Sequence, residues 1–167
     1  MVKARMHKLC VVLLLFSLCS TAQDKLIANI SSEGFDFLID TTMFKQEVRD
    51  IIFSKDDSLH FYDKVSIVRD TSFGDKQEIY YYVLLEDFST NYSTVKWLEK
   101  RSDSLMMIND LKDKNYLQFL FFCCQGLVDC TPKVGWLQGQ KKWTCGGSFV
   151  CVIDGSCITS KVAHFNE

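Results

Sequence analysis

Cysteines are the residues whose type and spacing give this 167-residue chain its clearest chemistry. Six of its eight cysteines fall within the last 45 residues: Cys123, Cys124, Cys130, Cys145, Cys151 and Cys157. An even number of cysteines in an exported chain is first interpreted as a set of disulfides. We therefore expect three bridges, with the adjacent Cys123 and Cys124 bonded to different partners. The sequence alone does not select the pairing.

A metal site is the alternative use of these cysteines. Structural zinc favours closely spaced cysteine pairs, often combined with histidines. Here 0, 5, 14, 5 and 5 residues separate successive cysteines, and His164 is the only histidine nearby. We therefore expect neither a metal nor a cofactor.

Catalytic groups are hard to assemble from the remaining residues. The region after residue 22 has only two histidines, His60 and His164, and the chain contains no Gly-x-Ser-x-Gly motif. Two acid pairs, Asp56-Asp57 and Glu86-Asp87, could in principle cleave glycosides. However, neighbouring residues on a strand point to opposite faces, which does not suit two groups sharing one substrate. We identify no catalytic residue and expect a protein that is not an enzyme, with a small secreted hydrolase using carboxylates as the alternative.

A binding surface is predicted between Cys130 and Cys145. This segment contains two tryptophans and two neighbouring lysines, Trp136, Lys141, Lys142 and Trp143. Aromatic and cationic side chains are common in binding hot spots, and a bridge closing the segment would preorganise a binding loop. The alternative interpretation is that both tryptophans cap a small core.

Residues 1–22 are typical of a secretory signal peptide. A basic start precedes an apolar run over 9–18, which is too short to cross a bilayer, and the small residues Ser20 and Ala22 follow it. Cleavage before Gln23 predicts a secreted or periplasmic protein.

Cys19 leaves a second outcome for this segment. A bacterial lipoprotein signal also ends in a cysteine, which becomes lipid-anchored. In such signals a small residue normally precedes the cysteine, whereas the residue before Cys19 is the large Leu18. A membrane-anchored lipoprotein at Cys19 is therefore the less favoured alternative.

The mature chain, 23–167, is expected to form a single globular domain with a disulfide-rich part over 123–157. Residues 1–22 contain three basic residues and no acidic one, so the mature chain has a net charge of about −5. This charge argues against a nucleic-acid partner, and no later apolar run is long enough to span a membrane. We expect the partner to be another protein, with an inhibitor or an immunity-type factor as the kind of molecule.

The apolar pattern predicts an α+β fold. One amphipathic helix is expected at 42–53, and an antiparallel hairpin or meander is expected to begin with strands at 59–69 and 77–87. The stretch 93–128 fits helices or strands, and we favour strands at 104–109 and 116–124.

The two ends of the mature chain complete the expected fold. Residues 23–34 are expected on the surface or as an edge strand, followed by a short strand around Phe35 and Phe37. A disulfide-stapled C-terminal β-hairpin is expected around the turn residues Asp154 and Gly155.

Overall fold

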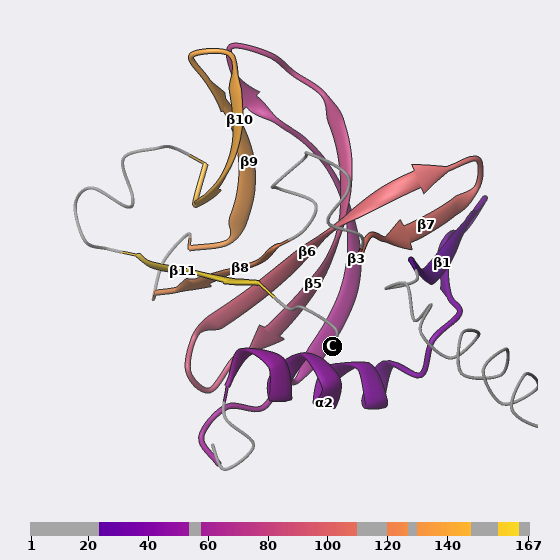
Figure 1. Cartoon of the computed structure of the whole chain (residues 1–167), viewed down its shortest axis with the longest axis vertical. Coiled ribbons are helices and arrows are strands. Elements are labelled where there is room, and N and C mark those ends of the chain that lie inside the picture. Colours follow the sequence, from indigo (N-terminus) through magenta and orange to yellow (C-terminus); the bar gives the residue numbers. More distant parts are fainter. Residues whose placement is uncertain (1–23, 54–57, 110–119, 127–129, 148–156, 164–167) are drawn as a thin grey trace, which may run out of the picture.

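A computed structural model of the chain describes residues 24–53, 58–109, 120–126, 130–147 and 157–163 (Figure 1). The predicted signal peptide, Cys151, His164 and the predicted turn at Asp154–Gly155 lie outside these ranges. Within them, no helix combines the length and apolar composition that crossing a membrane requires.

The described chain is mostly β, with a single helix, rather than an even α+β mixture. Its elements are, in order, β1 (Lys25–Ser31), β2 (Gly34–Phe37), α2 (Thr41–Ile52), β3 (Lys64–Thr71), β4 (Phe73–Gly74), β5 (Ile79–Asp87), β6 (Tyr92–Arg101), β7 (Ser104–Met107), β8 (Leu120–Gln125), β9 (Pro132–Leu137), β10 (Gln140–Cys145) and β11 (Ile158–Ala163).

The main sheet has eight strands and is antiparallel throughout its recorded pairings. The predicted hairpin is confirmed, since β3 pairs with β5 from Lys64–Glu86 to Thr71–Ile79. Strand β6 holds the sheet together, because it pairs with β5 and β8 and then, at its end, with β7. The segments at 104–109 and 116–124 were thus correctly predicted to contain strands, β7 and β8, although 110–119 lies outside the described residues.

The N-terminal strand differs from its prediction. The strand order of the main sheet includes β6-β7-β1-β2, with β2 at the edge. β1 is therefore not an edge strand, because it pairs with both β7 and β2. Its Ile27 and Ala28 are fully buried. A register shift between Leu26 and Ala28 interrupts the alternation, so the adjacent Ile27 and Ala28 are both buried, and Ile30 also packs against the core. A regular alternating pattern would not reveal this position.

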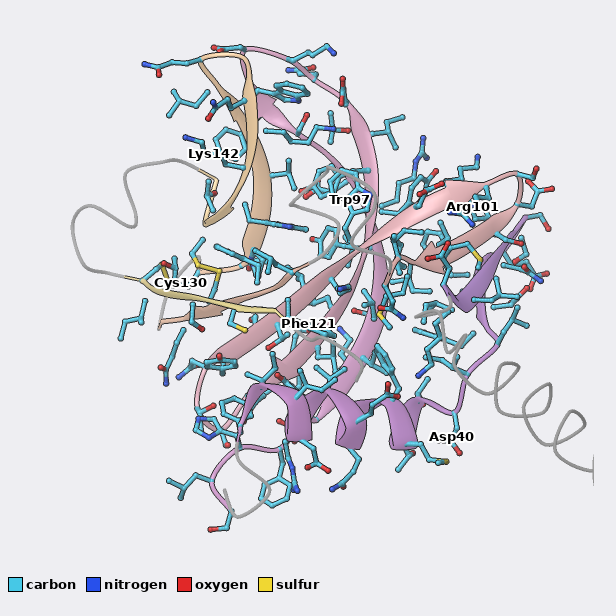
Figure 2. All side chains as sticks on the ribbon, viewed as in Figure 1. Asp40, Trp97, Arg101, Phe121, Cys130 and Lys142 are labelled. Carbon is cyan, nitrogen blue, oxygen red and sulfur yellow. A yellow bond between two sulfur atoms is a disulfide. The ribbon has the colours of Figure 1, made fainter. Side chains whose placement is uncertain are left out.

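Helix α2 covers one face of the sheet and matches the predicted helix at 42–53 to within one residue (Figure 1). Asp40 caps its start, since a carboxylate oxygen accepts hydrogen bonds from the backbone N–H of Thr42 at 2.8 Å and of Met43 at 3.0 Å (Figure 2). Phe44 and Val48, one turn apart, are buried against the sheet.

Strand alternation divides the core into two clusters. On β5, Val83 and Leu85 join the cluster beneath α2, whereas Tyr80, Tyr82 and Leu84 join a cluster on the opposite face. A smaller sheet of β10, β9 and β4 covers that opposite face, so the fold has three layers. Gly74 of β4, with φ +88°, is needed for this pairing, because a Cβ there would collide with the carbonyl oxygen of Trp136.

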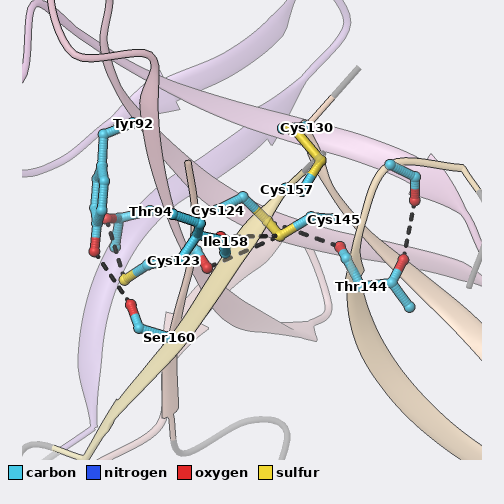
Figure 3. The surroundings of a disulfide bond; sticks show 11 residues. Tyr92, Thr94, Cys123, Cys124, Cys130, Thr144, Cys145, Cys157, Ile158 and Ser160 are labelled. Atoms are coloured by element: carbon cyan, nitrogen blue, oxygen red, sulfur yellow. Dashed lines mark hydrogen bonds between the residues drawn. A yellow bond between two sulfur atoms is a disulfide. The ribbon is translucent and has the colours of Figure 1, made fainter. Parts of the chain in front are cut away.

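Two disulfides fasten the hairpin side of the molecule, Cys124–Cys145 and Cys130–Cys157. The expectation that Cys123 would form a third is wrong, since its thiol is free and buried. Cys123 and Cys124 are neighbours on β8, so their side chains point to opposite faces. Figure 3 shows the Cys123 thiol near Tyr92 and Thr94, away from the bridge that Cys124 makes.

Candidate functional site

The predicted binding segment is a β-hairpin rather than a loop closed by its own bridge. Lys141 pairs with Trp136, and Trp143 pairs with Val134, across β10 and β9. The turn between the strands has positive φ at Gln138 and Gly139, which matches the twist of a tight hairpin. The cysteines at its two ends are not bonded to each other, because each bridges to a residue outside the hairpin.

Trp143 is part of the core, as the alternative interpretation proposed. Only 7% of it is exposed. Its ring meets those of Tyr80, Tyr82 and Trp97 edge-on and stacks on that of Phe122, with centroid distances of 5.5 to 6.3 Å. Such aromatic contacts add to the stabilisation from burial. Trp143 therefore fastens the hairpin to the main sheet and is not available to a partner.

Lys141 is enclosed between two tryptophans. Its ammonium nitrogen lies 5.0 Å from the ring centroid of Trp97 and 5.0 Å from that of Trp136. Lys76 lies 4.9 Å from the Trp136 ring. Glu78 pairs with Lys141 at 2.7 Å and with Lys76 at 2.6 Å, and these hydrogen bonds hold the pKa of its carboxyl below the ordinary value. The two ammonium groups thus share one carboxylate and the faces of two tryptophan rings within the hairpin side itself.

Lys142 is the exposed member of the predicted set. It pairs with Gly135 across the hairpin, and strand alternation places it on the outer face, opposite to Lys141 and Trp143. Figure 2 labels it on β10. Of the four predicted binding residues, Trp143 is therefore in the core, and Lys142 faces solvent. Trp136 and Lys141 contact each other on the inner face of the hairpin.

A groove of about 500 Å³ lies where β5 and β6 separate. Pairing between them ends at Tyr81–Leu98, although β6 continues to Arg101 and there pairs with β7. The lining residues come from three strands: Arg69, Ile79, Tyr80, Tyr81, Trp97, Leu98, Glu99 and Lys100. Trp97 connects the two regions, because it also contacts Lys141.

The groove carries two cations without counter-ions in the part of the chain that the structure describes. Arg69 and Lys100 are exposed, and neither forms an ion pair with a described residue. The one carboxylate of the lining, that of Glu99, is bound by Arg101 at 2.8 Å. The groove therefore has an apolar and aromatic wall with excess positive charge.

Of the two acid pairs, only Glu86-Asp87 lies in the described part of the chain, and its Asp87 has a structural role. Asp87 accepts hydrogen bonds from the backbone of Phe61 and from the backbone and hydroxyls of Ser89 and Thr90, so it organises the turn after β5. Burial favours its neutral form, but these hydrogen bonds prevail and lower its pKa below the ordinary value. A general acid needs the opposite shift.

The other candidate groups are also accounted for or lie outside the described ranges. Glu86 forms an ion pair with Lys64, and Asp56-Asp57 falls in the undescribed segment. The His60 ring stacks on that of Phe53 with centroids 4.1 Å apart. Among the described residues, no three His, Cys, Asp or Glu side chains are grouped so as to hold a metal ion.

Comparisons with known proteins found no matching family model, no similar curated protein and no similar solved structure. Sequence reasoning missed the groove because Arg69 and Lys100 are far apart in the chain and line one groove only through the pairing of β3, β5 and β6.

Proposed function

We propose that this chain is an exported, non-enzymatic domain that binds another protein, and that its binding surface is the groove between β5 and β6. The observation that carries the proposal is a groove with aromatic lining residues beside Arg69 and Lys100, which form no ion pair with a described residue. Arginine and aromatic side chains are enriched in binding hot spots, and such residues bind best in pockets that exclude water. An inhibitor or an immunity-type factor would work through a surface of this kind.

Export is part of the proposal. It rests on the signal-like segment 1–22 and on the two disulfides, which persist in oxidising compartments. Mass spectrometry of the mature N-terminus distinguishes a free protein beginning at Gln23 from a lipoprotein acylated at Cys19. An intact leader in the protein recovered from cells would contradict export.

Partner capture with two matched double variants tests the surface. The chain released by the producing cells is immobilised and exposed to envelope and medium fractions. The groove variant is Arg69→Gln with Lys100→Gln. The control variant is Lys133→Gln with Lys142→Gln, which removes the same charge from the outer face of the hairpin.

We expect the groove variant to lose a partner that wild type and the control variant both retain. Unchanged melting temperatures would show that both variants are folded, since surface substitutions of this kind usually have small effects. Loss of the partner in the control variant alone would contradict the groove and support the hairpin.

A further inference from the structure

Resting on the proposed function, we propose that the groove binds an extended, acidic peptide segment of the partner protein. Arg69 and Lys100 are assigned to its carboxylates, and Ile79 and Tyr81 to its aliphatic side chains. The four residues come from β3, β5 and β6, and strand register places them together.

Register shows that the cations and the apolar residues share a face. Arg69 is opposite Tyr81 on β5, and Tyr81 is opposite Leu98 on β6. Ile79 is two residues before Tyr81, and Lys100 is two residues after Leu98. Because residues two apart on a strand share a face, these two lie on the same face as Arg69, Tyr81 and Leu98, which is the face that α2 partly covers. Phe35 of β2 packs edge-on against the Tyr81 ring, with the ring centroids 6.2 Å apart.

The charge of the groove selects an acidic ligand. Glu99 is neutralised by Arg101, which also contacts Asp24 at 3.0 Å, so the groove's own carboxylate has its counter-ion. Arg69 and Lys100 have no such partner in the described chain, although the chain as a whole carries a net charge of −2. A guanidinium presents a planar set of donors that matches a carboxylate, and an ammonium supplies a second positive charge.

The shape of the groove favours an extended backbone. Beyond Tyr81 and Leu98 the two strands separate, so the first residues of β5 pair only with β3 and the last residues of β6 pair only with β7. The two inner edges face each other across the groove without a described strand between them. Unpaired strand edges commonly take up an extended segment through main-chain hydrogen bonds, while alternate side chains occupy adjacent pockets.

A volume of about 500 Å³ is within the range of ordinary ligand sites, which supports a short segment rather than a whole domain face. Every second side chain of an extended peptide lies on one face, so carboxylates and aliphatic groups in turn at those positions would contact Arg69 and Lys100, and Ile79 and Tyr81. Single-stranded nucleic acid also combines anionic and stacking groups. The acidic charge of the chain disfavours it, because nucleic-acid binding relies on a cationic surface.

Fluorescence anisotropy with labelled peptides tests the assignment. The probe is a labelled peptide in which glutamate and valine alternate at every second position, with serine between them, so that both kinds of side chain lie on one face of the extended peptide. The matched peptide has glutamine in place of each glutamate, and a labelled oligothymidylate provides the nucleic-acid comparison. The protein is the chain released from cells that express the full sequence, as wild type, as the groove variant or as the control variant defined above.

We expect the glutamate peptide to bind the wild type at least about tenfold more tightly than the glutamine peptide does. The affinity of the glutamate peptide should fall in high salt. The groove variant should weaken glutamate-peptide binding about tenfold, and the control variant should leave it unchanged. Equal binding of the two peptides, stronger binding of the oligothymidylate, or equal binding by the groove variant and wild type would each overturn the inference.

Failure here is distinguishable from failure of the proposed function. If the groove variant loses the captured partner while wild type ignores the glutamate peptide, the groove binds a protein but not an acidic extended segment. If the groove variant retains the partner as well, the binding surface itself is wrongly placed.

Discussion

On the helix side of the main sheet, the core consists of aliphatic and aromatic residues packed beneath α2 and contains no described disulfide. On the hairpin side, the core is dominated by aromatic rings and includes both disulfides. The difference follows from the size of the covering layers. A small two-stranded hairpin buries too little surface to be stable alone, so large rings and covalent bridges hold it.

The comparison of the hairpin side with the groove separates residues that support the fold from residues that could contact a partner. Tryptophan and lysine suggest binding wherever they cluster, but on the hairpin side Trp143 is in the core and Lys141 is paired with Glu78. In the groove, Arg69 and Lys100 contribute no described ion pair to the fold. The groove is therefore the better candidate for binding, although its residues are less conspicuous in the sequence.

Removing the central ring of the hairpin side should have the largest effect. We predict that Trp143→Ala destabilises the protein by about 3–5 kcal/mol, because it leaves a cavity among Tyr80, Tyr82 and Phe122. Urea unfolding followed by circular dichroism measures this. Lys142→Ala, at the exposed neighbouring position, should change the free energy of unfolding by less than about 0.5 kcal/mol. Similar effects of the two substitutions would show that Trp143 does not support the hairpin.

Removing one bridge should also weaken this side. For Cys124→Ala with Cys145→Ala, whose sequence separation is 21, we predict a loss of about 3 kcal/mol. Tryptophan fluorescence is a selective probe, because Trp97, Trp136 and Trp143 are the chain's three tryptophans and all contact the hairpin side.

Cys123→Ala is the matched control for the bridge, since it removes a buried thiol that forms no disulfide. We expect a smaller loss than from the bridge pair and an unchanged tryptophan spectrum. If Cys123→Ala lowers stability as much as removal of the bridge does, the loss in the bridge variant is explained by cavity formation and not by the missing cross-link.

A buried lysine on the helix side sharpens the comparison. Lys96 is 2% exposed beside the Phe121 ring, and desolvation lowers its pKa to about 8. Between that value and the unfolded pKa, the unfolded state binds more protons, so folding stability should rise with pH. We predict that the stability of the wild type relative to Lys96→Met rises by about 1 kcal/mol or more from pH 8 to 10, measured by urea unfolding; this difference cancels the opposing ionisation of the buried tyrosines, whose pKa values are raised. The same slope in both proteins would contradict the assignment.

The smallest predicted effect concerns the helix cap. Asp40→Ala should cost about 1 kcal/mol, because it removes the acceptor for the N–H groups of Thr42 and Met43. Asp40→Asn retains a capping oxygen and should cost less. Thermal unfolding measures both, and equal losses would show that the side-chain oxygen is not what stabilises α2.

Local patterns predicted much of the fold. The periodicity of Phe44 and Val48 identified α2, and the β-branched and aromatic run of β5 identified the hairpin with β3. Patterns could not predict what depends on contacts between distant segments. Three features follow from sheet order and register, which local periodicity does not contain: the interior position of β1, the free thiol of Cys123 and the groove that Arg69 and Lys100 both line.

Amide hydrogen exchange with and without the bound glutamate peptide tests the central claim most directly, because it compares the groove with the hairpin in one experiment. We predict slower exchange in the first residues of β5 and the last residues of β6, with the exposed outer face around Lys133 and Lys142 unchanged. Protection confined to β9 and β10 would contradict the account and return the binding site to the hairpin.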